Sequence, residues 1–305
     1  MENFVPPPLV LTDKELDRES HLSRWRFLLS DWIPIWDHLG LSYIPCLSTD
    51  QNLGISAQSY LSSEDGGESM TEFISLMSGL NSARKRGEFS CDVIRWDCCS
   101  GYSLKSFMER ANGDLVVASQ NCDSYIHRLS GPDDDERASS IFGDVYAQKG
   151  PDFYVRIYKR PIVPMMKIEG YPVEFRVFVE KSQVVGVSSY YPHRPLPNEY
   201  RNAARKVAEM TLPMCEYQAD FSADWGITRN HEYILIECGP PHDRIGGAHP
   251  CCFLSDPTNI RGVALQPVDL SRVPMRVRER YGLFSGIEPQ PPLMRATPDR
   301  KGKGQ

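Results

Sequence analysis

Residues 174–191 read EFRVFVEKSQVVGVSSYY, two runs rich in Val, Phe and Tyr that are joined by the polar segment EKSQ. Such runs are typical of β-strands, and a short polar segment between two of them predicts a hairpin turn. Because side chains of a strand alternate between its faces, Glu174 and Arg176 share one face, while the apolar residues at odd positions from 175 to 179 share the other. A basic residue on such a face is costly unless it meets an opposite charge. Arg176 is therefore expected either to contact an anionic ligand or to form an Arg–Glu pair.

The segments around this hairpin alternate between strand and helix patterns. FYVRIYKRPIV at 153–163 and EYILIEC at 232–238 are predicted strands, because both are rich in Ile, Val and Tyr. NEYRNAARKVAEMTLPM, at 198–214, is a predicted helix. The order of elements along the chain indicates an α+β architecture of two packed lobes.

The N-terminal part follows the same alternation. Residues 12–40 predict a helix that Pro34 kinks or divides. Its tryptophans could stack on a ligand, but their helical spacing favours an amphipathic face buried against a sheet. A second helix is predicted over 69–86 and a strand over 91–98, whereas the Gly- and Ser-rich residues 50–70 predict a loop.

Acidic residues stand near the ends of two predicted strands. Asp220 and Asp224 belong to the segment QADFSADWG, and Glu237 follows the apolar run YILI. Carboxylates on adjacent strands repel each other unless a cation bridges them, and hard oxygen ligands suit Mg²⁺, which then holds nucleotide phosphates. A surface position without a ligand is the simpler prediction for Asp224. It is less expected for Glu237, which follows the apolar run YILI.

A weaker signal lies further upstream. VIRWD at 93–97 contains Arg95, and a Ser-Gly pair and Lys105 follow it. A strand, a tight turn and a basic residue in this order fit a phosphate contact and ordinary structure equally well.

Composition excludes several classes of protein. The chain has 305 residues, of which 41% are hydrophobic and 24% charged, as in ordinary globular proteins. A net charge of -6 argues against coating nucleic acid by bulk electrostatics. The chain has neither a signal-peptide pattern nor an apolar run of about 18 residues, so a membrane protein is not expected. Its nine cysteines include no CxxC pair, which favours reduced thiols in a cytoplasmic protein.

Taken in order, these segments resemble the ATP-grasp superfamily. The hairpin EFRVFVEKSQVVGVSSYY and the pair ADFSAD…YILIECGPP carry the likeness, which covers about residues 90–255. Two groups are the most similar: the cell-division-cycle family of translation-initiation-factor assembly chaperones, and a phage and bacterial clade of ATP-grasp domains named for an arginine and two lysines. The resemblance implies two α+β lobes that enclose a nucleotide cleft, ATP and Mg²⁺ as ligands, and a preceding N-terminal lobe.

The resemblance also implies domain limits. Residues 1–85 would form the N-terminal lobe, and residues 86–265 would form the nucleotide-binding and metal-binding lobes. The Pro-rich tail 266–305 would be disordered at its end.

The resemblance assigns basic residues to the phosphates. Arg95 would contact phosphate in the nucleotide-binding lobe, with Lys105 as a second contact. Arg156 would take the place of the basic residue on the strand that leads to the adenine hinge. Arg176 would touch the phosphates, and both Arg156 and Arg176 would have catalytic roles, since arginines can stabilise charge that develops at the γ-phosphate.

Hinge and metal ligands follow in the same way. Tyr158, Lys159 and Ile162 belong to the implied hinge, whose backbone would bind the base. Asp220 and Glu237 would bind Mg²⁺. Many ATP-grasp enzymes carry an Asn two residues after the metal-binding Glu, but this chain has Gly at position 239. The missing contact would be absent, or supplied by Asp220, Asp224 or His242.

Two functions remain open. An ATP-grasp ligase phosphorylates a carboxylate to an acylphosphate that an amine then attacks, and it requires no side-chain nucleophile. The substrates would be ATP, a small-molecule or peptide carboxylate and an amine. His193 could be a substrate contact, but a lone histidine at such a place is more often structural or exposed. The alternative is a non-catalytic ATP-binding protein that assembles a protein partner. Nucleic-acid end joining is disfavoured, because no lysine lies in a convincing adenylation motif.

Overall fold

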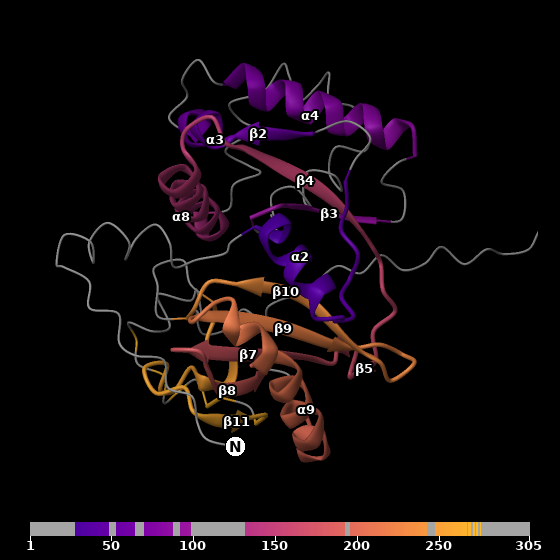
Figure 1. The fold of residues 1–305 in the computed structure, drawn as a ribbon, viewed down its shortest axis with the longest axis vertical. Helices are drawn as coiled ribbons and strands as arrows, with labels where there is room; N and C mark the ends of the chain where they lie inside the picture. The colour runs from indigo at the N-terminus through magenta and orange to yellow at the C-terminus, as the bar shows by residue number, and fades with distance from the viewer. Residues whose placement is uncertain are drawn as a thin grey trace, which may run out of the picture.

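The computed structural model describes residues 28–48, 53–64, 70–87, 92–98, 132–192, 196–242 and 248–266, together with positions 268, 269, 271, 273 and 275. Within these ranges the chain forms two main sheets, each with its own helices and its own apolar core (Figure 1), and one small two-stranded sheet. We call them the small-sheet lobe and the large-sheet lobe. The predicted α+β architecture of two lobes is confirmed.

The small-sheet lobe is built around one strand, β4 (Tyr154–Pro161). On one edge β4 pairs with β1 (Leu47–Ser48) and β2 (Gly54–Ser56), and on the other with β3 (Asp92–Trp96), all antiparallel. The strand β2 needs glycine at position 54, because a Cβ there would lie 2.3 Å from the carbonyl oxygen of Val155. Three helices pack around this sheet: α3 (Ala57–Glu64), α4 (Met70–Lys85) and α8 (Pro132–Lys149).

The large-sheet lobe contains five strands in the order β10-β9-β7-β8-β11. Its central hairpin is β7 (Glu174–Glu180) and β8 (Gln183–Ser189), and β9 (Phe221–Ile227) and β10 (Tyr233–Gly239) extend the sheet antiparallel. The short β11 (Gly262–Ala264) runs parallel to β8. The strands β5 (Lys167–Ile168) and β6 (Tyr171–Pro172) form a separate small antiparallel hairpin. In the sequence this hairpin lies between β4 and β7.

The central hairpin turns as its sequence predicts. Only Lys181 and Ser182 separate the two strands, and both have positive φ, at 50° and 60°. A two-residue loop of this kind matches the twist of the flanking strands. The predicted segregation of β7 is also confirmed, since Phe175, Val177 and Val179 lie in the apolar core of the large-sheet lobe.

Two helices cover the core face of the large sheet (Figure 1). The helix α9 (Arg201–Thr211) lies between the short 3-10 turns η1 (Asn198–Tyr200) and η2 (Leu212–Glu216), and a third turn, η3 (Cys251–Phe253), follows β10. The helix α2 (Leu29–His38) buries Trp32 and Trp36, and Trp32 packs on Phe221 with ring centroids 5.1 Å apart. The predicted amphipathic face is thus confirmed for the described part of the 12–40 segment.

The helix α2 also ties the two lobes together. It packs on the large sheet, but its first turn is held by Asp97, which directly follows β3 of the small sheet. The carboxylate of Asp97 accepts hydrogen bonds from Ser30 N at 2.9 Å and from Ser30 Oγ at 2.7 Å. Because an acceptor at a helix N-terminus satisfies an otherwise orphaned N–H, this contact fixes α2 relative to both sheets.

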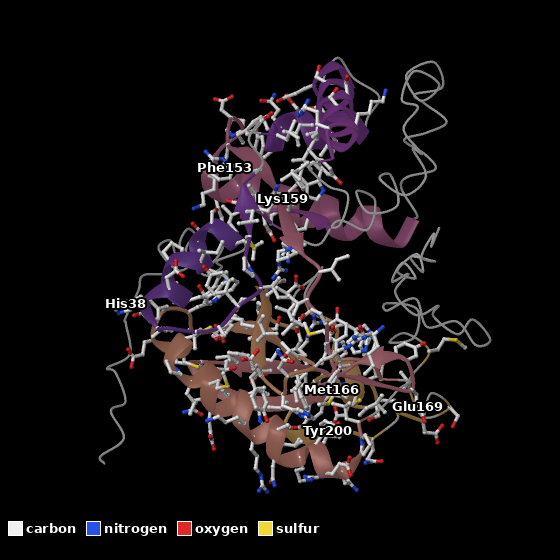
Figure 2. The ribbon with its side chains drawn as sticks, turned by 90° about the vertical axis from the view of Figure 1, so that its right-hand side faces the viewer. His38, Phe153, Lys159, Met166, Glu169 and Tyr200 are labelled. Carbon is white, nitrogen blue, oxygen red and sulfur yellow. The ribbon has the colours of Figure 1, made fainter. Side chains whose placement is uncertain are left out.

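Two expectations about the N-terminal half differ from the structure. The polar composition of 50–70 predicts a loop, but β2 and α3 occupy 54–64, because pairing with β4 overrides local composition. The expected domain limit after residue 85 falls inside the small-sheet lobe, where Leu53, Leu80 and Ile157 share one core. Figure 2 marks Phe153 in this lobe, with Met166 and Tyr200 in the large-sheet lobe.

No helix in the described ranges is long and apolar enough to cross a membrane.

Candidate functional site

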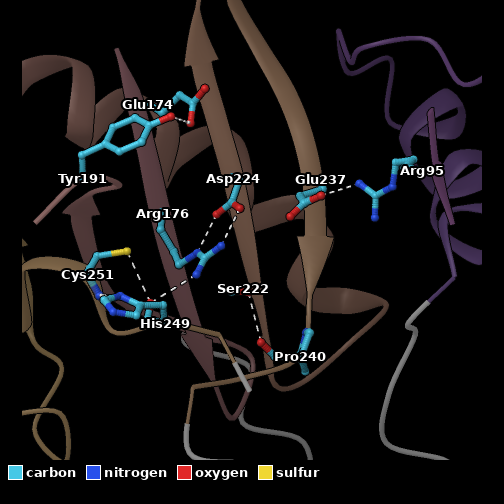
Figure 3. Close-up of polar contacts among 10 residues, drawn as sticks. All are labelled: Arg95, Glu174, Arg176, Tyr191, Ser222, Asp224, Glu237, Pro240, His249 and Cys251. Carbon is cyan, nitrogen blue, oxygen red and sulfur yellow. Dashed lines mark hydrogen bonds and ion pairs between the residues drawn. The ribbon is translucent and has the colours of Figure 1, made fainter. Parts of the chain in front are cut away.

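Charged side chains form a row across the large sheet, on the face opposite its apolar core. The row consists of Glu174 and Arg176 on β7, Asp224 on β9, Glu237 on β10 and Arg95 on β3 of the small sheet (Figure 3). Figure 3 shows the row running from Glu174 to Arg95. We call these five residues the charged row. It is the place where charges from both lobes meet.

Arg176 and Asp224 form the buried centre of the row. Their side chains are 4% and 5% exposed, and Nε and Nη2 of Arg176 each donate to one carboxylate oxygen of Asp224 at 2.7 Å. Nη1 donates to the carbonyl oxygen of His249 at 3.2 Å, and the guanidinium lies 4.8 Å from the ring centroid of Tyr190. Burial alone would lower the pKa of Arg176, but the charge of Asp224 raises it. A bidentate pair of this kind is strong and geometrically specific.

This pair answers the question left open by the sequence of β7. Arg176 meets a carboxylate, and the carboxylate comes from Asp224 of β9 rather than from a glutamate. Asp224 is only 3% exposed, so its predicted surface position is wrong. The two residues pair directly across β7 and β9, where side chains of one face approach each other.

A β-bulge in β10 decides which face of the sheet carries Glu237. Trp225 pairs with Leu235 and Asp224 pairs with Glu237, so Ile236 is the extra residue. In a regular strand Glu237 would follow Leu235 onto the core face, because side chains alternate with a period of two. The bulge moves Glu237 to the face that carries Asp224. Carboxylates of neighbouring strands thereby reach the same face.

Glu237 connects the large sheet to the small sheet. Its Oε2 forms an ion pair and hydrogen bond with Nη1 of Arg95. The Arg95 side chain is 5% exposed and that of Glu237 is 18% exposed, so solvent reaches the carboxylate of Glu237. The Nε of Arg95 donates to its own neighbour, the carbonyl oxygen of Trp96, at 3.1 Å. This end of the row is therefore more open than the Arg176–Asp224 pair.

Glu174 lies at the other end of the row. Its Oε2 accepts a hydrogen bond from the hydroxyl of Tyr191 at 3.3 Å. Burial raises the pKa of Glu174 from 4.5 to about 7, with a further contribution from the negative charge of Asp224. Glu174 can therefore gain or lose a proton near neutral pH.

Arg160 on β4 is a buried cation next to the row that the sequence interpretation did not select. It is 5% exposed, and its Nη2 donates to the carbonyl oxygens of Ile44 and of the bulge residue Ile236. Burial, together with the nearby charge of Arg95, lowers its pKa to about 10. Strand alternation already puts Arg156 and Arg160 on one face of β4, but sequence could not indicate which lies deeper.

Other predicted site residues are not members of the charged row. Arg156 is exposed, Lys159 is half-buried, and Ile162, beyond the end of β4, is 56% exposed. Tyr158 is buried, and its backbone lies between β1 and β3, in register with both, which leaves little of it for a nucleotide base. Lys105 lies outside the described residues, as does His193.

Asp220 does not join the other carboxylates. It precedes β9, and its Oδ1 accepts a hydrogen bond from the backbone N–H of Lys181 in the β7–β8 turn, at 2.8 Å. Asp224, four residues further on, is the residue that lies opposite Glu237 in the register of β9 and β10. His242 stacks edge-on against Phe178, outside the row.

The donor atoms present fit Mg²⁺ only in part. In the ranges that the structure describes, no three or more His, Cys, Asp or Glu side chains are arranged to hold a metal ion. Mg²⁺ often takes one or two carboxylates and completes its shell with water and substrate phosphates. Glu237, whose side chain is partly exposed to solvent, can supply one such carboxylate. Asp224 is less suited, because both of its carboxylate oxygens already accept hydrogen bonds from Arg176.

Two surface pockets lie elsewhere on the large-sheet lobe. One, of about 430 Å³, is lined by residues such as Arg201, Val263 and Gln266, and the other, of about 310 Å³, by residues such as Met166 and Tyr233. Neither includes a member of the charged row. Because these pockets hold no comparable cluster of buried charge, the row remains the best candidate for chemistry.

No protein-family model matches this chain, and no curated protein matches it. Similar solved structures include Cdc123 from Schizosaccharomyces pombe in C-terminally truncated form, with 15% identity over 85% of this chain and 100% of that chain and a TM-score of 0.46. A further Cdc123 structure from the same organism has 16% identity, coverage of 76% and 87%, and a TM-score of 0.42. The macrocyclase MdnB from Microcystis aeruginosa has 18% identity, coverage of 41% and 39%, and a TM-score of 0.18. At these values, function has to be inferred from the site itself.

Proposed function

We propose that this chain is an ATP-grasp-like protein that binds Mg-ATP where its two lobes meet and assists the assembly of a protein partner. One observation carries the binding proposal. Arg95 and Arg160 of the small sheet converge with Glu237 of the large sheet at a point that solvent reaches. Guanidinium groups suit phosphate oxygens, and a carboxylate beside them suits the cation that accompanies a nucleotide.

Each charged residue has a distinct task in this proposal. Arg95 would neutralise phosphate charge, and Glu237 would hold Mg²⁺, which supplies positive charge to the phosphates when bound. Arg176 holds Asp224 in place through two hydrogen bonds. Asp224 is the cross-strand neighbour of Glu237, so the Arg176–Asp224 pair lies directly beside the carboxylate that would hold Mg²⁺. The predicted direct contact of Arg176 with phosphate is less favoured, because three of its N–H groups already donate within the protein.

Assembly of a protein partner is favoured over ligation for two reasons. The resemblance of the EFRVFV hairpin to the cell-division-cycle chaperones implies ATP binding without turnover. In addition, Arg176, the arginine expected to stabilise a transferring phosphoryl group, already donates three hydrogen bonds, two to Asp224 and one to the carbonyl oxygen of His249. A partner protein fits these features without requiring a second substrate site.

A carboxylate–amine ligase is the second candidate, and Glu174 is the observation that favours it. A ligase needs a group that accepts a proton from the attacking amine, and such a group works best with a pKa close to the working pH. The pKa of Glu174 is raised to about 7 by burial and by Asp224. Glu174 would then be the base, with ATP, a carboxylate and an amine as substrates.

Thermal unfolding with and without ATP and Mg²⁺ tests the binding proposal. A ligand at 100 times its Kd stabilises the folded state by about 2.7 kcal/mol, which raises the unfolding temperature by several degrees. We expect a rise that requires Mg²⁺ and that Glu237→Gln weakens. No rise at millimolar ATP would contradict the proposal.

Release of ADP separates the two candidate functions in the same samples. An assembly factor should release little ADP whether or not carboxylates and amines are added. Release that depends on both a carboxylate and an amine, and that Glu174→Gln abolishes, would favour the ligase instead.

A further inference from the structure

The pocket of about 310 Å³ lies at the end of the large sheet where β9 turns into β10. Segments that are distant in the sequence line it: the turn η1 with the start of α9, the end of β9, the start of β10, and Met166 just before β5. This volume is at the lower end of the range for small-molecule sites. The pocket therefore suits one long side chain of another protein better than a cofactor.

Its walls are aromatic and apolar. Tyr200, Tyr233 and Met166 are half-buried and pack against the apolar core of the large-sheet lobe, to which the buried Ile227 belongs. The hydroxyl of Tyr200 donates a hydrogen bond to the sulfur of Met166 at 3.3 Å, and Figure 2 shows both residues side by side in this lobe. Two tyrosine rings and a thioether favour a ligand with a flat or apolar body.

Backbone hydrogen bonds hold the pocket in shape. The N–H of Met166 donates to the carbonyl oxygen of Ile227 at 2.8 Å. In the β9–β10 turn, the N–H of His231 donates to the carbonyl oxygen of Thr228 at 2.9 Å, and the N–H of Glu232 donates to the hydroxyl of Thr228 at 3.2 Å. Because the walls are already ordered, binding there costs little conformational entropy.

The pocket also carries a negative charge. Among the described residues, one carboxylate and no lysine or arginine line it. The carboxylate belongs to Glu199, which is exposed and forms no ion pair or side-chain hydrogen bond with the described residues. Burial raises the pKa of Tyr200 and the charge of Glu199 adds to the rise, so this carboxylate acts on the aromatic wall. Arg201, two residues further on, lines the other pocket instead.

Glu199 has a simpler role as well. It precedes α9, and a negative charge near the N-terminus of a helix stabilises that helix. This role accounts for the exposed carboxylate but not for the aromatic pocket beside it. Only a binding measurement separates the two roles.

We propose that this pocket binds an arginine side chain that a partner protein presents. The inference rests on the proposed function, because it names the chemistry by which the protein partner is recognised. A guanidinium group is planar and weakly hydrated, so it can stack on a tyrosine ring while it pairs with a carboxylate. The ammonium group of lysine is compact and strongly hydrated, which suits this pocket less well. The net charge of -6 also favours the approach of a basic partner surface.

Titration with Nα-acetyl-arginine amide tests the assignment, with the methionine methyl groups followed by NMR at pH 8, where histidine side chains are ordinarily neutral. We expect the methyl signal of Met166 to shift, whereas that of Met275, which is 65% exposed and not among the lining residues, should stay in place. Nα-acetyl-citrulline amide has nearly the same shape without the charge and should bind at least about fivefold more weakly. Equal binding of the two probes would overturn the proposal, because the pocket would then recognise only an apolar body.

Single variants separate the pocket from the overall charge of the protein. Glu199→Gln should weaken binding of the arginine probe about threefold and leave the citrulline probe unchanged. Glu209→Gln removes the same charge from an exposed position further along α9 and should bind like the unchanged protein. Equal weakening by both variants would mean that bulk charge attracts the probe, which would overturn the site.

The aromatic wall is tested at Tyr233. Tyr233→Leu keeps an apolar side chain but removes the ring, so it should weaken the arginine probe more than the citrulline probe. If Tyr233→Leu unfolds, Tyr233→Phe, which keeps the ring, should bind the arginine probe like the unchanged protein. Loss of binding in Tyr233→Phe would contradict stacking on this ring.

The two proposals fail in different ways, because these titrations contain no nucleotide. If the arginine probe leaves the Met166 signal unmoved while Mg-ATP raises the unfolding temperature, only the arginine site is wrong. If the arginine probe binds and Mg-ATP causes no rise, the proposed function is wrong and the arginine site stands on its own.

Discussion

At the β7 end of the charged row, Arg176 and Asp224 satisfy each other with two hydrogen bonds of 2.7 Å, and both are almost fully buried. At the β3 end, the carboxylate of Glu237, whose side chain is 18% exposed, acts on both Arg95 and Arg160, and Nε of Arg160 has no hydrogen-bond partner among the described residues. Among the described residues, the first region is a closed pair of one guanidinium and one carboxylate, while the second brings two guanidinium groups close to a carboxylate that solvent reaches. We therefore expect a ligand at the second region rather than at the first.

The largest effect should come from breaking the balanced pair. Asp224→Ala leaves the guanidinium of Arg176 buried without a counter-charge, which should lower the free energy of unfolding by about 3–5 kcal/mol in urea titrations. Combining Arg176→Met with Asp224→Leu removes both charges and should cost much less. A single variant that is as stable as the unchanged protein would show that solvent reaches this pair.

Glu174→Gln should change how the stability of the protein depends on pH, because burial disfavours the ionised form of Glu174. A raised pKa of about 7 means that the contribution of Glu174 to stability is present below pH 4.5 and is lost as the pH rises through 7. The difference corresponds to at most about 3 kcal/mol. Unfolding curves from pH 4 to pH 8 should show Glu174→Gln gaining stability over the unchanged protein. Parallel curves would contradict the raised pKa.

Glu237→Gln should affect stability less, because its partner region is open to solvent. Losing the carboxylate that acts on Arg95 and Arg160 should lower the free energy of unfolding by about 1–2 kcal/mol, less than the loss expected for Asp224→Ala. Urea titrations of both variants measure this difference. Equal losses in Glu237→Gln and Asp224→Ala would remove the distinction between the two ends.

Asp220→Asn should have the smallest effect. Its carboxylate accepts one hydrogen bond at the β7–β8 turn, which an amide oxygen can also accept. Stability should change by less than about 0.5 kcal/mol, and Mg-ATP should stabilise the variant as it does the unchanged protein. Loss of the Mg²⁺ requirement in Asp220→Asn would restore Asp220 as a metal ligand.

The sequence alone determined the local features of this protein. Alternation within EFRVFV separated Arg176 from the residues that enter the core, and EKSQ indicated the turn at Lys181 and Ser182. The helix over 198–214 and the strand over 232–238 followed from short-range patterns, which depend on neighbours in the chain. ATP, Mg²⁺ and the assembly or ligase function entered through resemblance and stay predictions.

Only the tertiary structure decided which charges meet. Arg176 pairs with Asp224 because β7 and β9 are neighbours in the sheet, and no pattern within either strand contains that information. The bulge at Ile236 places Glu237 on the charged face, and the approach of β4 to β10 buries Arg160 while Arg156 stays exposed. Strand order, register and depth are set by packing between distant segments, so they appear only when the whole chain is folded.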